Sequence, residues 1–221
     1  GSHSGGVCPC FYVGAELVLM RNFSPRMTLQ YVENYKVTFL TGSPASLEML
    51  SRSQAKSHYD LSGLKGLVTM GAPLEKAACE KYMEILTPNI LNGYGTTESF
   101  WNSFLRPYDL PDNAGSVGGS CIDDEVRVVK VYEDRKAEPD ELVDTDGESV
   151  GEIIISSPGK TTYSYYNNDE EQEHKFYKGW MYTGDLGVWD RNLYITIKGR
   201  KDDMIVCSGE NIYPAQIEEA L

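Results

Sequence analysis

Long apolar runs and an excess of positive charge are both missing from this sequence of 221 residues. No apolar run approaches the roughly 20 residues that cross a bilayer as a helix, and no signal peptide is recognisable. Acidic residues outnumber basic ones by 33 to 20, which gives a formal net charge of −13. Such a charge disfavours nucleic acid or an anionic membrane as the main partner. We therefore expect a cytoplasmic protein with no transmembrane segment and no nucleic-acid partner.

Histidine and cysteine are too few and too scattered to suggest a metal site. The sequence has three histidines and five cysteines at irregular spacing, and Cys8 and Cys10 have no partners at zinc-site intervals. We expect reduced thiols and no zinc. The acidic excess is concentrated in residues 133–148 and 169–173, which we interpret as solvated loops.

The first hundred residues alternate between strand and helix patterns. The alternation runs through residues 16–20, 29–35, 37–40, 46–52, 67–70, 73–85 and 89–92, beginning and ending with a strand. This order predicts an α/β subdomain over residues 1–105, with a parallel sheet flanked by helices and right-handed crossovers.

A break rich in proline and glycine occupies residues 106–119, and the pattern beyond it is mostly β. Strand-like runs lie at residues 125–132, 151–156 and 193–197. We therefore expect a β-rich, barrel-like subdomain over residues 106–198.

Three loops follow strands of the predicted parallel sheet, at residues 42–44, 71–73 and 93–99. Ligands bind outside the carboxyl ends of strands in open α/β sheets, and small residues let the backbone approach them closely. Tight turns are the alternative explanation of the glycines. For the first loop the two explanations stand equal, whereas polar side chains favour a ligand at the other two.

The most informative segment, residues 182–213, places an acid and a base at the two ends of a predicted β-hairpin. The strands alternate on either side of the turn residues 190–192, so Asp185 should lie near Arg200. A carboxylate accepts hydrogen bonds from both hydroxyls of a ribose, and a guanidinium donates to the sugar or to a phosphate. Taken singly, each residue is more simply a turn acid or a surface ion-pair partner.

Four strings together resemble the adenylate-forming (AMP-binding) enzymes, which include acyl-CoA synthetases, luciferases and peptide-synthetase adenylation domains. The strings are Asn92-Gly-Tyr-Gly-Thr-Thr-Glu-Ser99, Tyr182-Thr-Gly-Asp-Leu186, Gly199-Arg-Lys-Asp-Asp203 and Ser208-Gly-Glu-Asn-Ile-Tyr-Pro214. The resemblance runs from about residue 11 to the end. Val206 and Ser208 depart from the luciferase branch and move the resemblance toward long-chain and short-chain acyl-CoA synthetases.

The resemblance implies an enzyme that activates a carboxylic acid with ATP and Mg²⁺ and transfers the acyl group to coenzyme A. It implies that Tyr94 faces adenine, that Thr97 offers a hydroxyl to the α-phosphate, and that Glu98 binds Mg²⁺. Thr97 and Glu98 are thus the expected catalytic residues. Core packing of Tyr94, a local turn at Thr97 and a solvent-exposed Glu98 are the alternatives. Asp185 and Arg200 would contact the ribose. The wall around adenine and ribose would include Gly71, Ala72, Pro73, Asn92 and Gly93.

The last segment, residues 199–221, would be the hinge and the start of a C-terminal lid domain. The resemblance places the hinge at Asp202, nucleotide and pantetheine contacts at Ser208 and Gly209, and a phosphate loop and a lid lysine outside this sequence. We therefore expect these 221 residues alone not to form acyl-adenylate. Two rivals stay open: an adenylation domain that loads a carrier protein, and a non-catalytic nucleotide-binding module.

Overall fold

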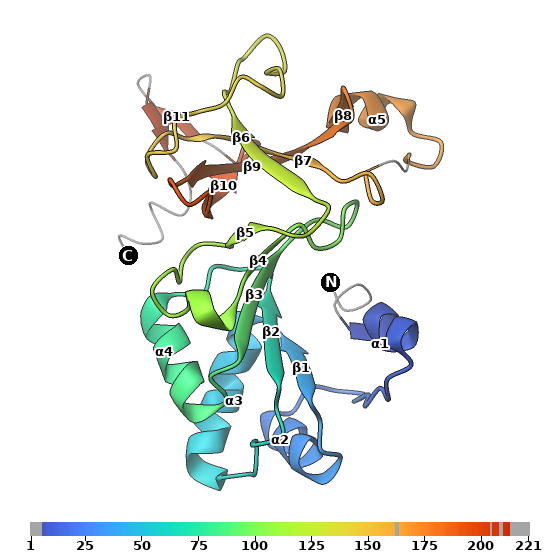
Figure 1. Ribbon diagram of the computed structural model, residues 1–221, viewed down its shortest axis with the longest axis vertical. Coiled ribbons are helices and arrows are strands. Elements are labelled where there is room, and N and C mark those ends of the chain that lie inside the picture. Colours follow the sequence, from blue (N-terminus) through green and yellow to red (C-terminus); the bar gives the residue numbers. More distant parts are fainter. Residues whose placement is uncertain (1–5, 162–163, 204, 208–209, 213–221) are drawn as a thin grey trace. The chain divides into compact units, whose positions relative to one another are not determined.

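The structure is a computed structural model that describes residues 6–161, 164–203, 205–207 and 210–212 (Figure 1). The chain divides into two compact units, and each is described by itself. The first comprises Gly1–Tyr94 and Phe104–Gly115, and the second comprises Gly95–Ser103 and Ser116–Leu221. Ser208 and Gly209 lie outside the described residues.

The first unit is an α/β structure with a parallel sheet. Its elements are α1 (Cys8–Val13), α2 (Pro25–Asn34), β1 (Phe39–Gly42), α3 (Pro44–Ser57), β2 (Gly66–Met70), α4 (Lys76–Ile85), β3 (Ile90–Tyr94), most of β4 (Ser103–Leu105) and a 3-10 turn at Pro107–Asp109. β1 pairs with β2 and β2 pairs with β3, both in parallel. The predicted parallel sheet is therefore confirmed.

Helices α2 and α3 begin where the sequence supplies a cap and a proline. Ser24 and Ser43 precede the first residues, Pro25 and Pro44, and each serine Oγ accepts a hydrogen bond from a backbone amide three residues on. Proline suits the first helical position because its fixed φ is already helical and it has no amide hydrogen to satisfy.

One hydrophobic core joins the helices of the first unit to its sheet. The helices contribute Leu29 of α2, Leu47 of α3 and Tyr82 of α4 to this core. The sheet contributes Leu67 of β2 and Ile90 of β3. All five side chains are buried, and Figure 1 shows α2, α3 and α4 beside these strands. The helical spacing of the apolar residues in the sequence reflects this shared core.

The first unit departs from the sequence prediction in several places, and α4 begins at Lys76 instead of residue 73. No strand forms at residues 16–20, where Leu19 is 72% exposed and no described segment pairs with it. β1 begins at Phe39 instead of residue 37, and α3 continues to Ser57 instead of ending near residue 52. Apolar alternation alone did not specify a strand at residues 16–20, because a strand also needs a neighbour for its backbone hydrogen bonds.

The second unit is mostly antiparallel β-structure. Its elements are β5 (Gly119–Ser120), β6 (Glu125–Val129), β7 (Gly151–Ser156), α5 (Asp169–Lys175), β8 (Phe176–Tyr177), β9 (Trp180–Trp189), β10 (Ile195–Arg200), β11 (Ile205–Cys207) and β12 (Glu210–Ile212). The main sheet has the strand order β10-β9-β7-β6, with β8 paired to β9. The predicted change from an α/β to a β-rich pattern is confirmed.

Strands β9 and β10 form the predicted hairpin. Ile195 pairs with Trp189 at the turn, and Arg200 pairs with Asp185 at the open end, after a register shift between Ile197 and Gly199. The second strand starts two residues later than predicted, because the turn extends through Leu193, which has a positive φ. The register brings the acid and the base together.

The acidic segment at residues 169–173 is a helix, so its prediction as a solvated loop was wrong. Asn168 caps α5 by accepting a hydrogen bond from the Glu171 amide at 3.2 Å. Three acids occupy the first turn, while His174 and Lys175 occupy the last. This arrangement complements the helix dipole, and local capping with charge order outweighed the loop-like composition.

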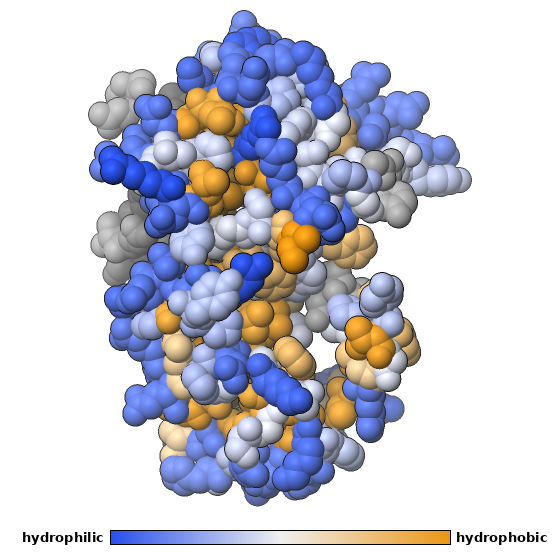
Figure 2. All heavy atoms as spheres, viewed as in Figure 1, coloured by the Kyte–Doolittle hydropathy of each residue, from blue (hydrophilic) through white to orange (hydrophobic). Residues whose placement is uncertain are grey.

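Hydrophilic side chains cover much of the face in Figure 2, in keeping with a charged content of 24%. Among the described residues, no helix combines the length and apolar character that membrane crossing requires. The described cysteines that are free are Cys8, Cys10, Cys79 and Cys121.

Candidate functional site

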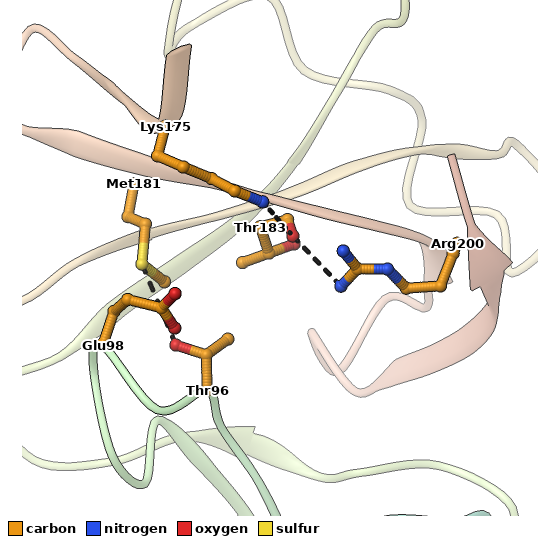
Figure 3. Close-up of a pocket in the computed structure, with 6 residues that line it drawn as sticks. All are labelled: Thr96, Glu98, Lys175, Met181, Thr183 and Arg200. Carbon is orange, nitrogen blue, oxygen red and sulfur yellow. Dashed lines mark hydrogen bonds between the residues drawn. The ribbon is translucent and has the colours of Figure 1, made fainter. Parts of the chain in front are cut away.

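The second unit contains a small open pocket that gathers residues from four segments (Figure 3). Its empty volume is about 310 Å³. The lining comes from the loop at residues 95–103, the end of α5, strand β9 and the end of β10, and consists of Thr96, Glu98, Lys175, Met181, Thr183 and Arg200. Two cations and one carboxylate therefore share the same space.

The loop at residues 95–103 folds back on itself and so presents Glu98 to the pocket. The Thr96 and Ser99 hydroxyl oxygens are 2.9 Å apart, and the Ser99 hydroxyl donates to Asn102 at 2.6 Å. A side chain at Gly95 would collide with the Phe100 carbonyl. The turn therefore requires glycine at this position for a steric reason, because there is no room for a Cβ atom.

A buried ion pair anchors the far end of this loop. Asp124, whose side chain is fully buried, accepts hydrogen bonds from Asn102 and Lys160. Lys160 Nζ also donates to the Trp101 carbonyl at 2.6 Å. No local pattern in the sequence pointed to Asp124 or Lys160, because they meet the loop only through tertiary contacts.

Glu98 is partly buried and is held in its ionised form. Its Oε1 accepts a hydrogen bond from the Tyr165 hydroxyl at 2.6 Å. Burial by itself raises the pKa of Glu98. Hydrogen bonds from Tyr165, from its own backbone and from Thr96, with the charge of Lys175, outweigh burial and lower that pKa below its ordinary value. Glu98 belongs to one of the sequence motifs, whereas no sequence pattern indicated Tyr165.

Asp185 and Arg200 form a close pair across the open end of the hairpin. Arg200 donates to Asp185 Oδ1 at 2.7 Å and to the Thr183 carbonyl at 3.3 Å. The Asp185 side chain is 13% exposed, whereas the Arg200 side chain is 44% exposed. Between them, Gly184 adopts φ +74°, and its carbonyl accepts a hydrogen bond from the Lys201 amide at 2.7 Å. The pair combines a buried acceptor with an accessible donor.

The predicted site residues are divided between the two units. In the first unit, Gly71, Ala72 and Pro73 are exposed just beyond β2, while Asn92, Gly93 and Tyr94 are buried in β3. In the second unit, Thr97 is exposed, and its neighbour Thr96 lines the pocket instead. Asp202 is exposed in the turn that follows β10.

A third charged residue of the pocket, Lys175, belongs to none of the sequence motifs. It ends α5, and its Nζ donates to the Thr183 carbonyl at 3.4 Å. The only available signal was the order of charges along residues 169–175, which is typical of a helix with its basic end at the C-terminus.

Comparison with known proteins places these features in one family. The family model described as AMP-binding enzyme matches residues 1–166. A long-chain-fatty-acid–CoA ligase of Bacillus subtilis (strain 168) is 28% identical over 98% of this chain. A fatty acid–[acyl-carrier-protein] ligase, ScoC, of Streptomyces coeruleorubidus is 28% identical over 100% of it.

A solved structure has the same fold as this chain. The O-succinylbenzoate coenzyme A synthetase MenE from Bacillus subtilis, in complex with AMP, has a TM-score of 0.82 and 26% identity over 96% of this chain. The chain spans 41% of that protein's chain, and 39% and 42% of the two ligases from Bacillus and Streptomyces.

Proposed function

This chain belongs to the AMP-binding enzyme family, and from that premise we propose that the protein is an AMP-forming acid–thiol ligase. It would activate a carboxylic acid with ATP and transfer the acyl group to coenzyme A. The observation that carries this proposal is the Asp185–Arg200 pair, which adjoins a pocket containing Glu98 and a second cation. The likeness to a synthetase in complex with AMP supports the same assignment.

The proposed reaction has two steps. In the first, a carboxylate oxygen of the acid attacks the α-phosphorus of ATP, and pyrophosphate leaves. In the second, the thiol sulfur of coenzyme A attacks the acyl carbon of the mixed anhydride, AMP leaves and the thiol proton passes to solvent. The first step joins two anions, so it requires positive charge and orientation from the protein.

We assign nucleotide binding to residues that the sequence motifs identified. Asp185 would accept hydrogen bonds from the ribose hydroxyls, while Arg200 fixes its carboxylate and donates to the sugar or phosphate. Adenine and ribose would be bound by Tyr94 and by the predicted wall around them. That wall comprises Gly71, Ala72, Pro73, Asn92 and Gly93. Thr97 is exposed, as a hydroxyl that meets a phosphate must be.

Glu98 fits a magnesium ion that is held jointly with the phosphates. Its carboxylate is a hard oxygen donor and is kept ionised by Tyr165. Among the described residues, no group of three or more histidine, cysteine, aspartate or glutamate side chains could hold a metal alone. One carboxylate plus phosphate oxygens is a common arrangement for Mg²⁺. When bound, the ion would neutralise charge on the phosphates.

Replacing Tyr165 with phenylalanine should raise the pKa of Glu98. Burial of the carboxyl remains, while the hydrogen bond that most lowers its pKa is lost. Because the pKa of Glu98 is depressed in the native protein, the carboxylate stays charged to a lower pH than an ordinary glutamate. The variant should therefore lose Mg²⁺-dependent activity at a higher pH on the acid side, measured as the pH profile of kcat/KM for ATP.

Tyr166→Phe is the matched control for that change, because the neighbouring tyrosine is 92% exposed. Its acid limb should coincide with that of the native enzyme. An acid limb that does not move in Tyr165→Phe would mean that Glu98 does not govern metal-dependent activity.

We further propose that the acid is a fatty acid and the acceptor coenzyme A. The long-chain-fatty-acid–CoA ligase of Bacillus supports this choice, while the ScoC ligase keeps a carrier-protein acceptor as the second candidate. The test is pyrophosphate release by the full-length protein with acids from two to eighteen carbons. Each acid is assayed without acceptor, with coenzyme A and with a phosphopantetheinylated carrier protein. Release that does not depend on any added acid would refute the ligase assignment.

We also propose a cytoplasmic location. The four free cysteines among the described residues are in keeping with a reducing compartment, where coenzyme A and ATP are both present.

A further inference from the structure

Lys175 reaches the same backbone group as Arg200, from the opposite side of the pocket (Figure 3). Its Nζ and an Arg200 guanidinium nitrogen donate to the Thr183 carbonyl, at 3.4 and 3.3 Å. Both cations also lie beside Gly184, where an added Cβ would stand 3.7 Å from Lys175 Nζ and 3.3 Å from Arg200. The two positive groups therefore converge on one short stretch of β9.

Arg200 and Lys175 differ in whether a carboxylate of the described residues neutralises their charge. Arg200 forms an ion pair with Asp185 at 2.7 Å, whereas Lys175 has no ion pair with any described residue. Glu98 attracts Lys175 through space, but its Oε1 is already engaged by Tyr165. A neutral carbonyl at 3.4 Å is a weak partner for an ammonium group. The pocket thus contains a positive charge suited to an anionic group from outside the chain.

The backbone that carries Lys175 is well anchored. The Tyr165 amide donates to Gln172 Oε1 at 3.0 Å, and Lys136 Nζ donates to the Glu173 carbonyl at 2.9 Å. Asn168 caps the start of the same helix. These contacts fix α5 at both its beginning and its end, so the Lys175 ammonium group approaches the pocket from a defined direction.

We propose that Lys175 binds the α-phosphate of the nucleotide and thereby positions it for attack by the acid. The inference rests on the proposed function, because the phosphate is that of AMP and ATP. The partly buried ammonium group would exchange its long bond to the Thr183 carbonyl for charge-assisted hydrogen bonds to phosphate oxygens. The sequence motifs of the site do not include this residue.

The test compares AMP with adenosine as calorimetric probes of the full-length protein. Lys175→Gln should weaken AMP binding by about tenfold to a hundredfold, the range for loss of one charged hydrogen bond. It should leave the adenosine Kd unchanged, because adenosine has no phosphate. Lys175→Arg should retain most of the preference for AMP. Lys178→Gln is the matched control, since that exposed lysine pairs with Glu138 and does not line the pocket.

Three results would overturn the inference. Equal AMP affinity in Lys175→Gln and the native protein would exclude a phosphate contact. A parallel loss of adenosine and AMP binding would show that Lys175 only maintains the fold. A native protein that binds neither probe would overturn the proposed function, and with it this role, whereas the first two results would leave the ligase assignment standing.

Discussion

Replacing Asp185 with alanine in the full-length protein should lower kcat/KM for ATP by about a hundredfold to ten-thousandfold, because two hydrogen bonds to a charged acceptor are each worth about 1.5–3 kcal/mol. In the native chain this carboxylate is almost buried and is oriented by Arg200 at 2.7 Å. Its orientation is therefore established before a ribose arrives. The measurement is the initial rate of pyrophosphate release as ATP is varied at saturating acid.

A comparison with 2′-deoxy-ATP separates a ribose contact from a general loss of activity. If Asp185 accepts a hydrogen bond from the 2′-hydroxyl, the native enzyme should prefer ATP to 2′-deoxy-ATP, and Asp185→Ala should lose that preference. Asp203→Ala is the control, because Asp203 is an exposed acid just beyond the same hairpin. A preference that persists undiminished in Asp185→Ala would assign the ribose contact to another residue.

The hairpin shows how much of this site was readable from sequence. Alternating residues on either side of a three-residue turn were sufficient to predict that Asp185 lies near Arg200, and the register pairs these two residues. Alternation along a strand determines on which face of the sheet each side chain lies, and a short turn restricts the pairing register of the two strands. Two conditions that are both local in sequence thus defined a tertiary contact.

The contacts that hold Glu98 were not readable in the same way. Tyr165 lies 67 positions further along the chain, so the two side chains meet only through the tertiary structure of the second unit. Lys160 and Asp124 reach that loop by a similar route. Long-range packing of polar side chains carries no periodic signal, so a single sequence gives no means of pairing them.

The prediction of a solvated loop for the acidic segment before β8 was wrong for a different reason. Composition suggested a loop, since five of its residues in a row are Asp, Glu or Gln. The order of charges within residues 169–175, with Asn168 ahead of them, is that of a capped helix. The error mattered for function, because the same helix brings Lys175 to the pocket.

Asp202→Pro in the full-length protein should slow thioester formation more than acyl-adenylate formation, by about tenfold or more. We propose Asp202 as the hinge of a C-terminal lid that takes one orientation for each half-reaction, and proline would fix φ near −65° at that position. The adenylating orientation comes first in the reaction, so we expect its step to survive better. Single-turnover measurement of both steps on one enzyme preparation gives the ratio directly.

The local structure makes this substitution a selective one. The neighbouring amides of Lys201 and Asp203 donate to the carbonyls of Gly184 and Arg200, but the Asp202 amide bonds to no described residue. Proline at 202 therefore breaks none of the described hydrogen bonds. Asp202→Ala keeps backbone freedom while removing the carboxylate, so it should leave the ratio of the two steps unchanged. Equal slowing of both steps by Asp202→Pro, or an altered ratio in Asp202→Ala, would place the hinge elsewhere or assign the effect to the side chain.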